Sequence, residues 1–194
     1  MSETLPLFPL HAVLFPEGDL ALRVFETRYI DMVRACLREG GGFGVCLIRE
    51  GSEVGAPAMP HDIGTCARII DTGMRAEGLL GIYTRGHRRF RIHAMEARPD
   101  QLVMAEVEWL EDLACVAQPP EPLRRLLAGL MGVEQAAPAG PMNDALWVTY
   151  RLAERLPLKL CERQTVLQAD TLAEAQAVIE AAVRRLGLWT EADA

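Results

Sequence analysis

"LPLFPLHAVLFPEGDLALRVFETRY", residues 5–29, is the stretch that decides how the first half of the chain folds. It is mostly apolar, yet Pro6, Pro9 and Pro16 interrupt it. A buried helix does not tolerate prolines at this spacing, and the apolar core of a secretory signal would be continuous. Because proline is confined to strand edges, strand starts and bulges, the stretch predicts short strands ("TLPLF", "AVLF", "LALRVF") joined by kinks and by a turn at "PEGD". The residues expected in the core are Leu7, Leu10, Val13, Phe15, Leu22 and Phe25.

The apolar period changes to that of a helix at residues 27–39, where Thr27 is the expected N-cap and "GGG" follows the end. Five further apolar segments then follow in quick succession: "FGVCLIR", "IGTCARIID", "GLLGIYTRG", "RRFRIHAME" and "LVMAEVEWLE". Glycine or proline stands in each gap, which is typical of strands in an all-β meander or barrel.

The chain changes character at "CVAQPPEP", where three prolines form a stiff joint. Beyond it the pattern predicts helices in "LRRLLAGLMGV", "DALWVTYRLAERL" and "LCERQTVLQA", and a fourth over residues 172–186. Thr171 and Glu174 form a possible capping box for the fourth helix. We therefore expect a strand-rich part at residues 1–116 and a helical part at residues 117–194.

Composition narrows the classes of partner. The 194 residues carry a net charge of −7, which argues against a broad electrostatic grip on nucleic acid or on an anionic membrane. No apolar run approaches the roughly 20 residues needed to cross a bilayer, and the first residues do not read as a secretory signal. A cytoplasmic protein without a membrane partner is the expectation.

The usual templates for catalysis are absent. The single lysine, Lys159, lies outside any Gly-rich phosphate loop, and neither of the two serines, Ser2 and Ser52, has the context of a nucleophile. The five cysteines are scattered without a CxxC pair, so buried thiols are expected instead of disulfides or zinc ligands. We expect no cofactor, no metal and no enzyme, although a pair of His61 and Cys66 stays open.

The segment "TRGHRRFRIHA" concentrates arginine. Strand alternation places Arg89 and Arg91 on one face and Phe90 and Ile92 on the other. A reader of nucleic acid would interleave exposed aromatic side chains with the charges, whereas Phe90 is expected on the apolar face. The segment is therefore interpreted as a half-buried strand.

The opening stretch resembles the start of the N-terminal substrate-binding domain of Lon proteases, in which an LPLFPL-type segment leads through a VLFPG-type turn into a RIFExRY-type strand and helix. "GTCARII" and "GHRRFRI" are similar to two later strands of that family. "RLAERLPLKLCERQTVLQADT" is similar to its LP-containing helix pair, with Arg163 and Gln164 where a K/R-Q pair is usual. The resemblance implies an α+β fold: a PUA-like, mostly antiparallel β-barrel with one inserted helix, followed by a C-terminal helical bundle.

The same resemblance implies a function. Full-length Lon continues into ATPase and Ser-Lys protease modules, which this sequence does not contain, so we expect a freestanding, non-catalytic version of the domain. It would bind exposed hydrophobic segments of client polypeptides, or a protease or chaperone partner, at a groove between the two parts or at an apolar patch. RNA binding and an unrecognised small-molecule enzyme are the alternatives. The oligomeric state is left open.

Residues for such binding are expected in two loops and the arginine-rich hairpin. They are Met59, His61, Asp62, Met74, Arg75, Arg89 and Arg91. Methionine suits adaptable apolar contacts. Glu26 and Arg28 are expected to form an ion pair, with each other or at the helix terminus, instead of contacting a ligand.

Overall fold

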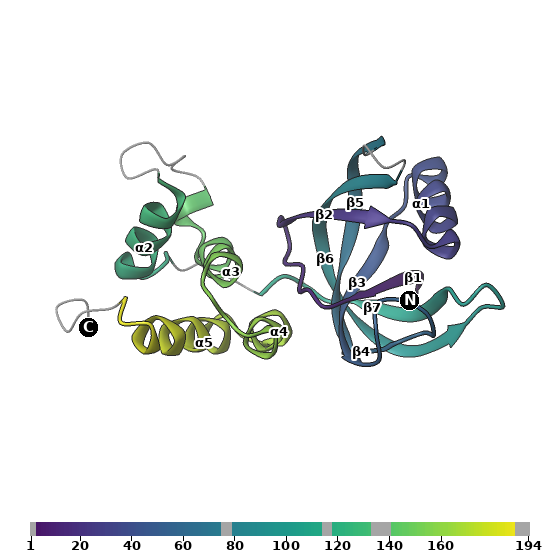
Figure 1. The fold of residues 1–194 in the computed structure, drawn as a ribbon. Helices are drawn as coiled ribbons and strands as arrows, with labels where there is room; N and C mark the ends of the chain where they lie inside the picture. The colour runs from purple at the N-terminus through teal and green to yellow at the C-terminus, as the bar shows by residue number, and fades with distance from the viewer. Residues whose placement is uncertain (1–2, 75–78, 114–117, 133–140, 189–194) are drawn as a thin grey trace. The chain divides into compact units, whose positions relative to one another are not determined.

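The computed structural model describes residues 3–74, 79–113, 118–132 and 141–188. The chain forms two compact units, Met1–Asp112 and Leu113–Ala194 (Figure 1). The predicted division after residue 116 falls within residues 114–117, outside the described residues, and it stays a prediction.

The first unit is a sheet with one helix. Its elements are β1 (Glu3–Leu10), β2 (Asp19–Val24), α1 (Thr27–Glu39), β3 (Phe43–Glu50), β4 (Met59–Pro60), β5 (Ile63–Met74), β6 (Leu80–Ala97) and β7 (Val103–Trp109). The strands pair in the order β1-β7-β6-β5-β3, and a parallel pairing of β1 with β3 closes this path into a ring. β2 pairs with β6 and β4 with β3, and every pairing except β1–β3 is antiparallel. The inserted helix and the predominance of antiparallel strands are as predicted.

β1 runs straight through two prolines. The predicted break after "TLPLF" is wrong, and so is the strand at "AVLF", because residues 11–18 form no strand. β1 pairs with β7 up to Pro6 and with β3 from Leu7 onward, so each half of the strand uses one edge only. A strand paired on one edge accepts proline wherever the missing N–H would point away from its partner.

The turn at "PEGD" is fastened to two other strands. The hydroxyl of Thr65 donates to the carbonyl of Leu14 (2.6 Å), and this bond is buried. The amide of Glu17 donates to the carbonyl of Gly86, and the amide of Gly86 donates to the carbonyl of Gly18, both at 2.8 Å. The segments "VLFPEG", "GTCARII" and "GHRRFRI" therefore meet at one place, where they hold β2 on β6.

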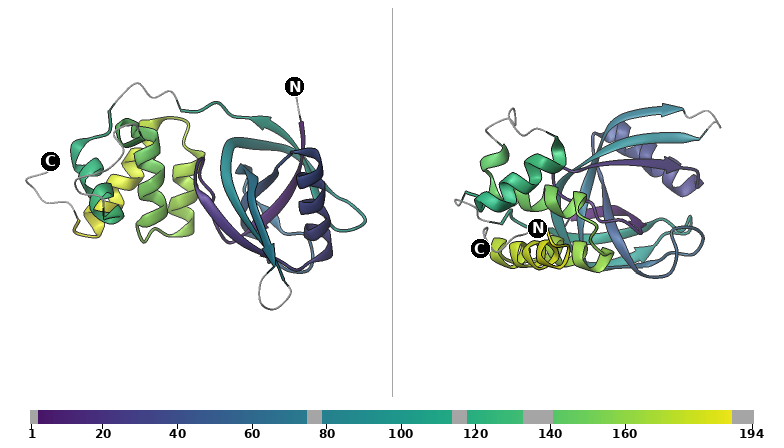
Figure 2. Two further views of the ribbon diagram at one scale, coloured as in Figure 1. Left: turned by 90° about the horizontal axis from the view of Figure 1, so that it is seen from above. Right: turned by 60° about the vertical axis from the view of Figure 1, so that its left-hand side comes forward.

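Two apolar clusters fill the first unit. One lies between α1 and the strands, where Phe8 stacks on Tyr29 with ring centroids 4.0 Å apart. α1 lies alongside the strands (Figures 1 and 2). The other cluster surrounds Phe90, which is fully buried and meets Trp109 edge to face at 6.2 Å. The first cluster fixes the helix against the strands and the second fills the space between strands.

Two details of the opening stretch differ from the prediction. Phe25 was expected in the core but its side chain is 55% exposed. It follows β2, in which Leu22 and Val24 face inward, so alternation turns the next side chain outward. The N-cap of α1 is Glu26 and not Thr27, and no side chain accepts the first free amides of the helix.

The second unit is helical. Its elements are α2 (Glu121–Met131), the short 3-10 helix η1 (Pro141–Asn143), α3 (Ala145–Arg155), α4 (Leu160–Gln168) and α5 (Leu172–Arg185). α3 contacts α2, α4 and α5 and is the centre of this group (Figure 2). The predicted capping box at the start of α5 is confirmed, since the Thr171 hydroxyl accepts from the amide of Glu174. The four predicted α-helices are present, and η1 lies where a loop was expected.

Side chains from α4 fasten its neighbours. Arg163 donates to the carbonyls of Glu154 (3.3 Å) and Leu156 (3.4 Å), which ties α4 to the end of α3. Glu162 accepts two hydrogen bonds from Arg185 of α5 and one from the amide of Lys159. The basic residue of the "RQ" pair thus has a structural role.

The Glu162–Arg185 pair predicts a small dependence of stability on pH. The hydrogen bond from Arg185, helped by the amide of Lys159, lowers the pKa of Glu162 to about 2. A folded-state pKa below the ordinary value means that this stabilisation is present above about pH 4.5 and is lost as pH falls towards 2. We expect Glu162→Gln to lower the melting temperature by about 1–3 °C at pH 7, since the pair is near the surface. In thermal scans the difference in melting temperature between the variant and the wild-type protein should vanish near pH 2. A difference that persists there would contradict the pairing.

Candidate functional site

An apolar groove lies between α1 and the adjoining ends of β5 and β6. Its volume is about 450 Å³. Its apolar lining comes from Val24, Phe25, Ile30, Val33, Leu37, Leu79 and Leu80, and Arg34 and Thr72 add polar atoms. A hollow lined mainly by large apolar side chains is the usual form of a site for an apolar ligand.

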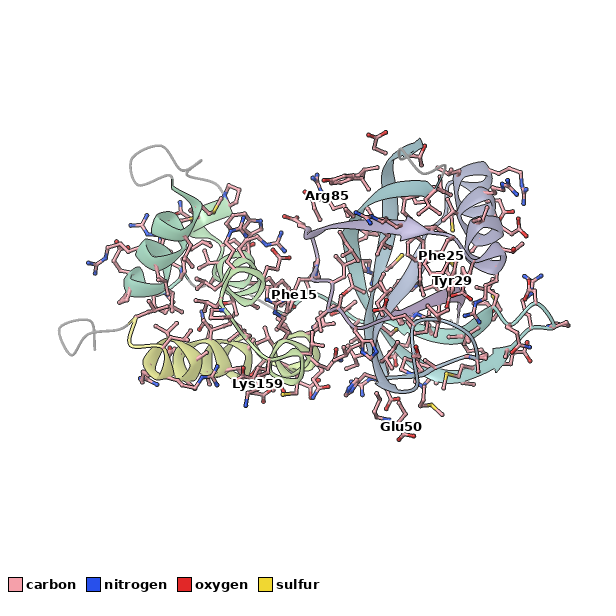
Figure 3. All side chains as sticks on the ribbon, in the orientation of Figure 1. Phe15, Phe25, Tyr29, Glu50, Arg85 and Lys159 are labelled. Carbon is pink, nitrogen blue, oxygen red and sulfur yellow. The ribbon has the colours of Figure 1, made fainter. Side chains whose placement is uncertain are left out.

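The groove arises from the spacing of residues on α1. Tyr29, Met32, Val33 and Cys36 form the buried stripe of this helix. Leu37 follows that stripe by one position, so it lies at its edge and is 53% exposed. Phe25 lies two residues before the first residue of α1 (Figure 3). Two large apolar side chains are thus held at the surface on either end of a rigid helix.

A polar pocket of about 390 Å³ adjoins Phe25 as well. It is lined by Phe25, Glu26, Thr27, Arg28, Gly55, Asp100 and Gln101. The residues come from the start of α1, the long loop before β4 and the turn between β6 and β7. Phe25 is therefore the residue that the groove and the polar pocket share.

The floor of the polar pocket is an ion pair. Arg28 is 7% exposed, and its Nη2 lies 2.8 Å from the Glu26 carboxylate. Its Nη1 donates to the carbonyl of Gln101 at 3.0 Å. The predicted pairing of Glu26 with Arg28 is confirmed. The buried guanidinium ties the start of α1 to the β6–β7 turn and so sets the wall of the polar pocket.

The predicted loop residues gather elsewhere, at β4 and the start of β5. Met59 is 41% exposed, His61 is half-buried and Asp62 is exposed. The amide of His61 donates to the carbonyl of Leu47, and the carbonyl of Asp62 accepts from the amide of Ile92, both at 2.8 Å. These contacts are backbone pairing, and their role in binding stays a prediction.

The other loop pair lies at the opposite end of β5. Met74 is the last residue of β5 and pairs with Leu80, a groove residue. Its side chain is not described, and Arg75 lies outside the described residues. The structure therefore brings the backbone of Met74 next to the groove and separates it along the strand from Met59, His61 and Asp62.

The arginine-rich hairpin differs from its expected form. Phe90 is buried as predicted, but Arg89 is also buried, with 4% exposure, and its Nη2 donates to the carbonyl of Glu111 (3.3 Å). The chain beyond β7 returns over this side of β6, where the amide of Leu110 donates to the carbonyl of Arg89. Arg91 is half-buried opposite Ile63. Alternation predicted that both arginines face solvent. This prediction is wrong for Arg89.

Three of the described thiols are enclosed in the first unit. Cys36, Cys46 and Cys66 are buried, as predicted, whereas Cys161 is exposed, and Cys115 lies outside the described residues. Burial raises the pKa of Cys66 to about 11 and raises that of Cys46 further. A thiol in this state is a poor nucleophile at neutral pH.

The described part of the chain shows neither a metal centre nor a membrane-spanning helix. In residues 3–74, 79–113, 118–132 and 141–188 no group of three or more His, Cys, Asp or Glu side chains could hold a metal ion. His93 instead pairs with Glu108 at 3.0 Å. Across the same residues, no helix combines the length and the apolar character required to pass through a bilayer.

Comparison with known protein families shows which family the chain belongs to. The model of the "ATP-dependent protease La (LON) substrate-binding domain" matches residues 4–179. The chain belongs to this family. The resemblance noted in the opening stretch, in the two β motifs and in the helix pair is thereby confirmed, and membership supports a module for substrate recognition.

Solved structures agree with that membership. A Lon N-terminal domain protein from Xanthomonas campestris is 37% identical, with a TM-score of 0.74 over 97% of this chain and 99% of that one. The N-terminal domain of Mycobacterium avium complex Lon protease has a TM-score of 0.66 over 93% of this chain and 98% of that one. At 18% identity, the second likeness concerns the fold alone. The predicted α+β class is confirmed.

A curated relative is much longer. The Lon protease of Treponema pallidum (strain Nichols) is 25% identical over 139 residues, which are 68% of this chain. The match spans only 15% of that protein.

Sequence reasoning missed Phe25 and Leu37 as surface residues. A signal for Phe25 was present, since Leu22 and Val24 are two apart and share a face, so residue 25 belongs to the other face. For Leu37 helical spacing gave only its place beside the buried stripe. Its exposure depends on how far β5 and β6 extend along the helix.

Proposed function

We propose that this protein binds exposed apolar segments of client polypeptides in the groove beside Phe25. The observation that carries the proposal is the pair of large apolar side chains, Phe25 and Leu37, which are more than half exposed and line one hollow. Ordinary surfaces avoid grouping such side chains unless they meet a partner. Membership of a substrate-binding family supports the same conclusion.

The groove suits an extended segment or one helical turn. Its walls are held by packed elements, because Val33 belongs to the cluster between α1 and the strands. A preformed site loses little entropy when it binds, so a few apolar side chains of the client are sufficient for measurable affinity. Clients of this kind include unfolded or partly unfolded polypeptides, which expose apolar side chains that a folded protein buries.

Binding, and not catalysis, is the role that we infer. Cys66, the one candidate for a Cys-His pair, has a buried thiol with a raised pKa. RNA binding has less support, because Arg89 is buried and Arg85 is paired with Asp19 at 2.7 Å. A cytoplasmic location and a protease or chaperone as partner stay predictions from the sequence.

Loss of one exposed leucine is expected to weaken binding without unfolding the protein. The probe is a fluorescein-labelled 12-residue peptide with a Leu-Phe-Leu centre in a Gly/Ser background, measured by fluorescence anisotropy. We expect Leu37→Ser to raise the Kd about fivefold or more, which is typical of a contact residue within an apolar site. The melting temperature should stay within about 2 °C of the wild-type value, because the side chain is exposed.

Met95→Ser provides the matched control. Met95 is 38% exposed on β6 and does not line the groove. The same kind of apolar-to-polar change there should leave peptide affinity unchanged. Equal losses of peptide affinity in Leu37→Ser and Met95→Ser would show that the peptide adheres non-specifically, and they would reject the groove as the binding site.

A further inference from the structure

Phe25 stands between two hollows of different character. Its ring lines both the apolar groove and the polar pocket, and it is 55% exposed. A polypeptide that lies in the groove and continues past this ring enters the polar pocket. The residue next to the apolar anchor of the client therefore meets the groups of that pocket.

The exposed charged group of the polar pocket is the carboxylate of Asp100. The guanidinium of Arg28 is buried, with its two terminal nitrogens directed at Glu26 and at the carbonyl of Gln101. The Asp100 side chain is 45% exposed, and its partner Arg98 lies at the longer distance of 3.5 Å. Asp100 thus presents a carboxylate to solvent, while the positive charge of the pocket is enclosed by protein atoms.

Phe25 and Asp100 line one pocket, and an aromatic ring together with a carboxylate suits a cation. An ammonium or guanidinium group over a phenyl ring is attracted by the negative face of the ring. The carboxylate of Asp100 adds a charge attraction, and the net charge of −7 on the whole chain favours a basic partner at long range. An acidic residue in the same place would meet the exposed carboxylate of Asp100 and be repelled, whereas the charges of Glu26 and Arg28 offset each other.

We propose that the preferred client segments carry a lysine or arginine next to their apolar residues, with the cation over Phe25 and beside Asp100. This inference rests on the proposed function, because it specifies the class of client for the same groove. It makes Phe25 a residue that determines specificity: one side of its ring contacts the apolar anchor and the exposed face receives the cation.

Three peptides that differ at one position test the preference. Each is the labelled Leu-Phe-Leu peptide, followed by lysine, norleucine or glutamate, and norleucine matches the lysine stem without its charge. With the full chain in 50 mM NaCl we expect lysine to bind about threefold tighter than norleucine, and glutamate more weakly than either. The difference in affinity between the lysine and norleucine peptides should become smaller in 500 mM NaCl, because salt screens exposed charges.

Two variants test the place of the cation. Asp100→Asn removes the charge but keeps the oxygen that accepts from the amide of Leu102 (3.1 Å). Asp100→Asn should reduce the difference in affinity between the lysine and norleucine peptides. Phe25→Leu, which keeps an apolar side chain, should reduce it as well. Glu106→Gln removes an exposed carboxylate of β7 that lines neither hollow, and it should leave this difference unchanged.

The outcomes separate the two proposals. Equal affinity of the three peptides, or tightest binding by the glutamate peptide, overturns the preference for a cation and leaves the apolar groove standing. A lysine preference that survives in both Asp100→Asn and Phe25→Leu overturns the assignment to this pocket. Absence of binding by all three peptides overturns the proposed function and the inference together.

Discussion

Gly86→Ala should destabilise the first unit by about 3 kcal/mol or more, the effect of forcing a methyl group against backbone. A Cβ atom built on Gly86 would overlap the carbonyl oxygen of Phe15, and it would lie 2.9 Å from the carbonyl carbon. The obstructing atoms are backbone and cannot rotate away as a side chain would. Movement of the turn would also break the hydrogen bonds that join Gly86 to Glu17 and Gly18.

Thermal unfolding measures this prediction directly. A loss of that size lowers the melting temperature of a protein of this length by about 10 °C. Gly73→Ala is the matched control, because a Cβ at Gly73 in β5 has no atom within 4 Å. The control should melt within about 2 °C of the wild-type protein. If Gly86→Ala melts with the control, the close approach of the turn to β6 is not a constraint on the fold.

Gly86 illustrates what a sequence can predict and what it cannot. The turn at "PEGD" and the strand "GHRRFRI" were each recognisable from local pattern and family resemblance. That they contact each other is a long-range fact, since Glu17 and Gly86 are brought together only when β2 pairs with β6. Local patterns give the elements, whereas the reason for a particular glycine depends on the pairing.

The proposed groove lies outside the loops that the sequence pointed to, for the same reason. Met59 and Asp62 were chosen because they lie in a long loop, yet backbone pairing gathers that loop around β4, away from the groove. The groove needs α1 to pack on the ends of β5 and β6, which no local pattern specifies. Arg89 was placed in solvent by alternation, but the segment after β7 covers it. The alternation of residues along a strand cannot predict that a distant segment will cover one of its faces.

The β1 strand shows a different limit. Its two prolines were interpreted as breaks because proline removes one donor from a ladder. The exchange of partners between Pro6 and Leu7, from β7 to β3, leaves each half of the strand with one paired edge. The closed path of strands therefore explains how an apolar strand with prolines at two positions stays continuous.

Phe90→Ala should destabilise the protein by about 3–5 kcal/mol, which is usual for deleting a buried phenyl ring. Phe90 is fully buried, and two glycines, Gly44 and Gly64, lie against its ring. A Cβ on Gly44 would lie 2.6 Å from the Cζ atom of Phe90, and a Cβ on Gly64 would lie 2.9 Å from the same atom. Strands that approach this closely cannot collapse further into the space that the ring leaves. The variant should also lose its edge-to-face contact with Trp109.

Phe25→Ala removes the same atoms from the surface and is the matched comparison. Because Phe25 is 55% exposed, this variant should lose less than about 1 kcal/mol of stability. Its Kd for the Leu-Phe-Leu peptide should nevertheless rise about fivefold or more, since the ring lines the groove. Urea unfolding and peptide anisotropy on both variants would thus dissociate the two roles. A destabilised Phe25→Ala would mean that the ring is a core residue and that the groove is closed in solution. A stable one that binds peptide normally would remove Phe25 from the site.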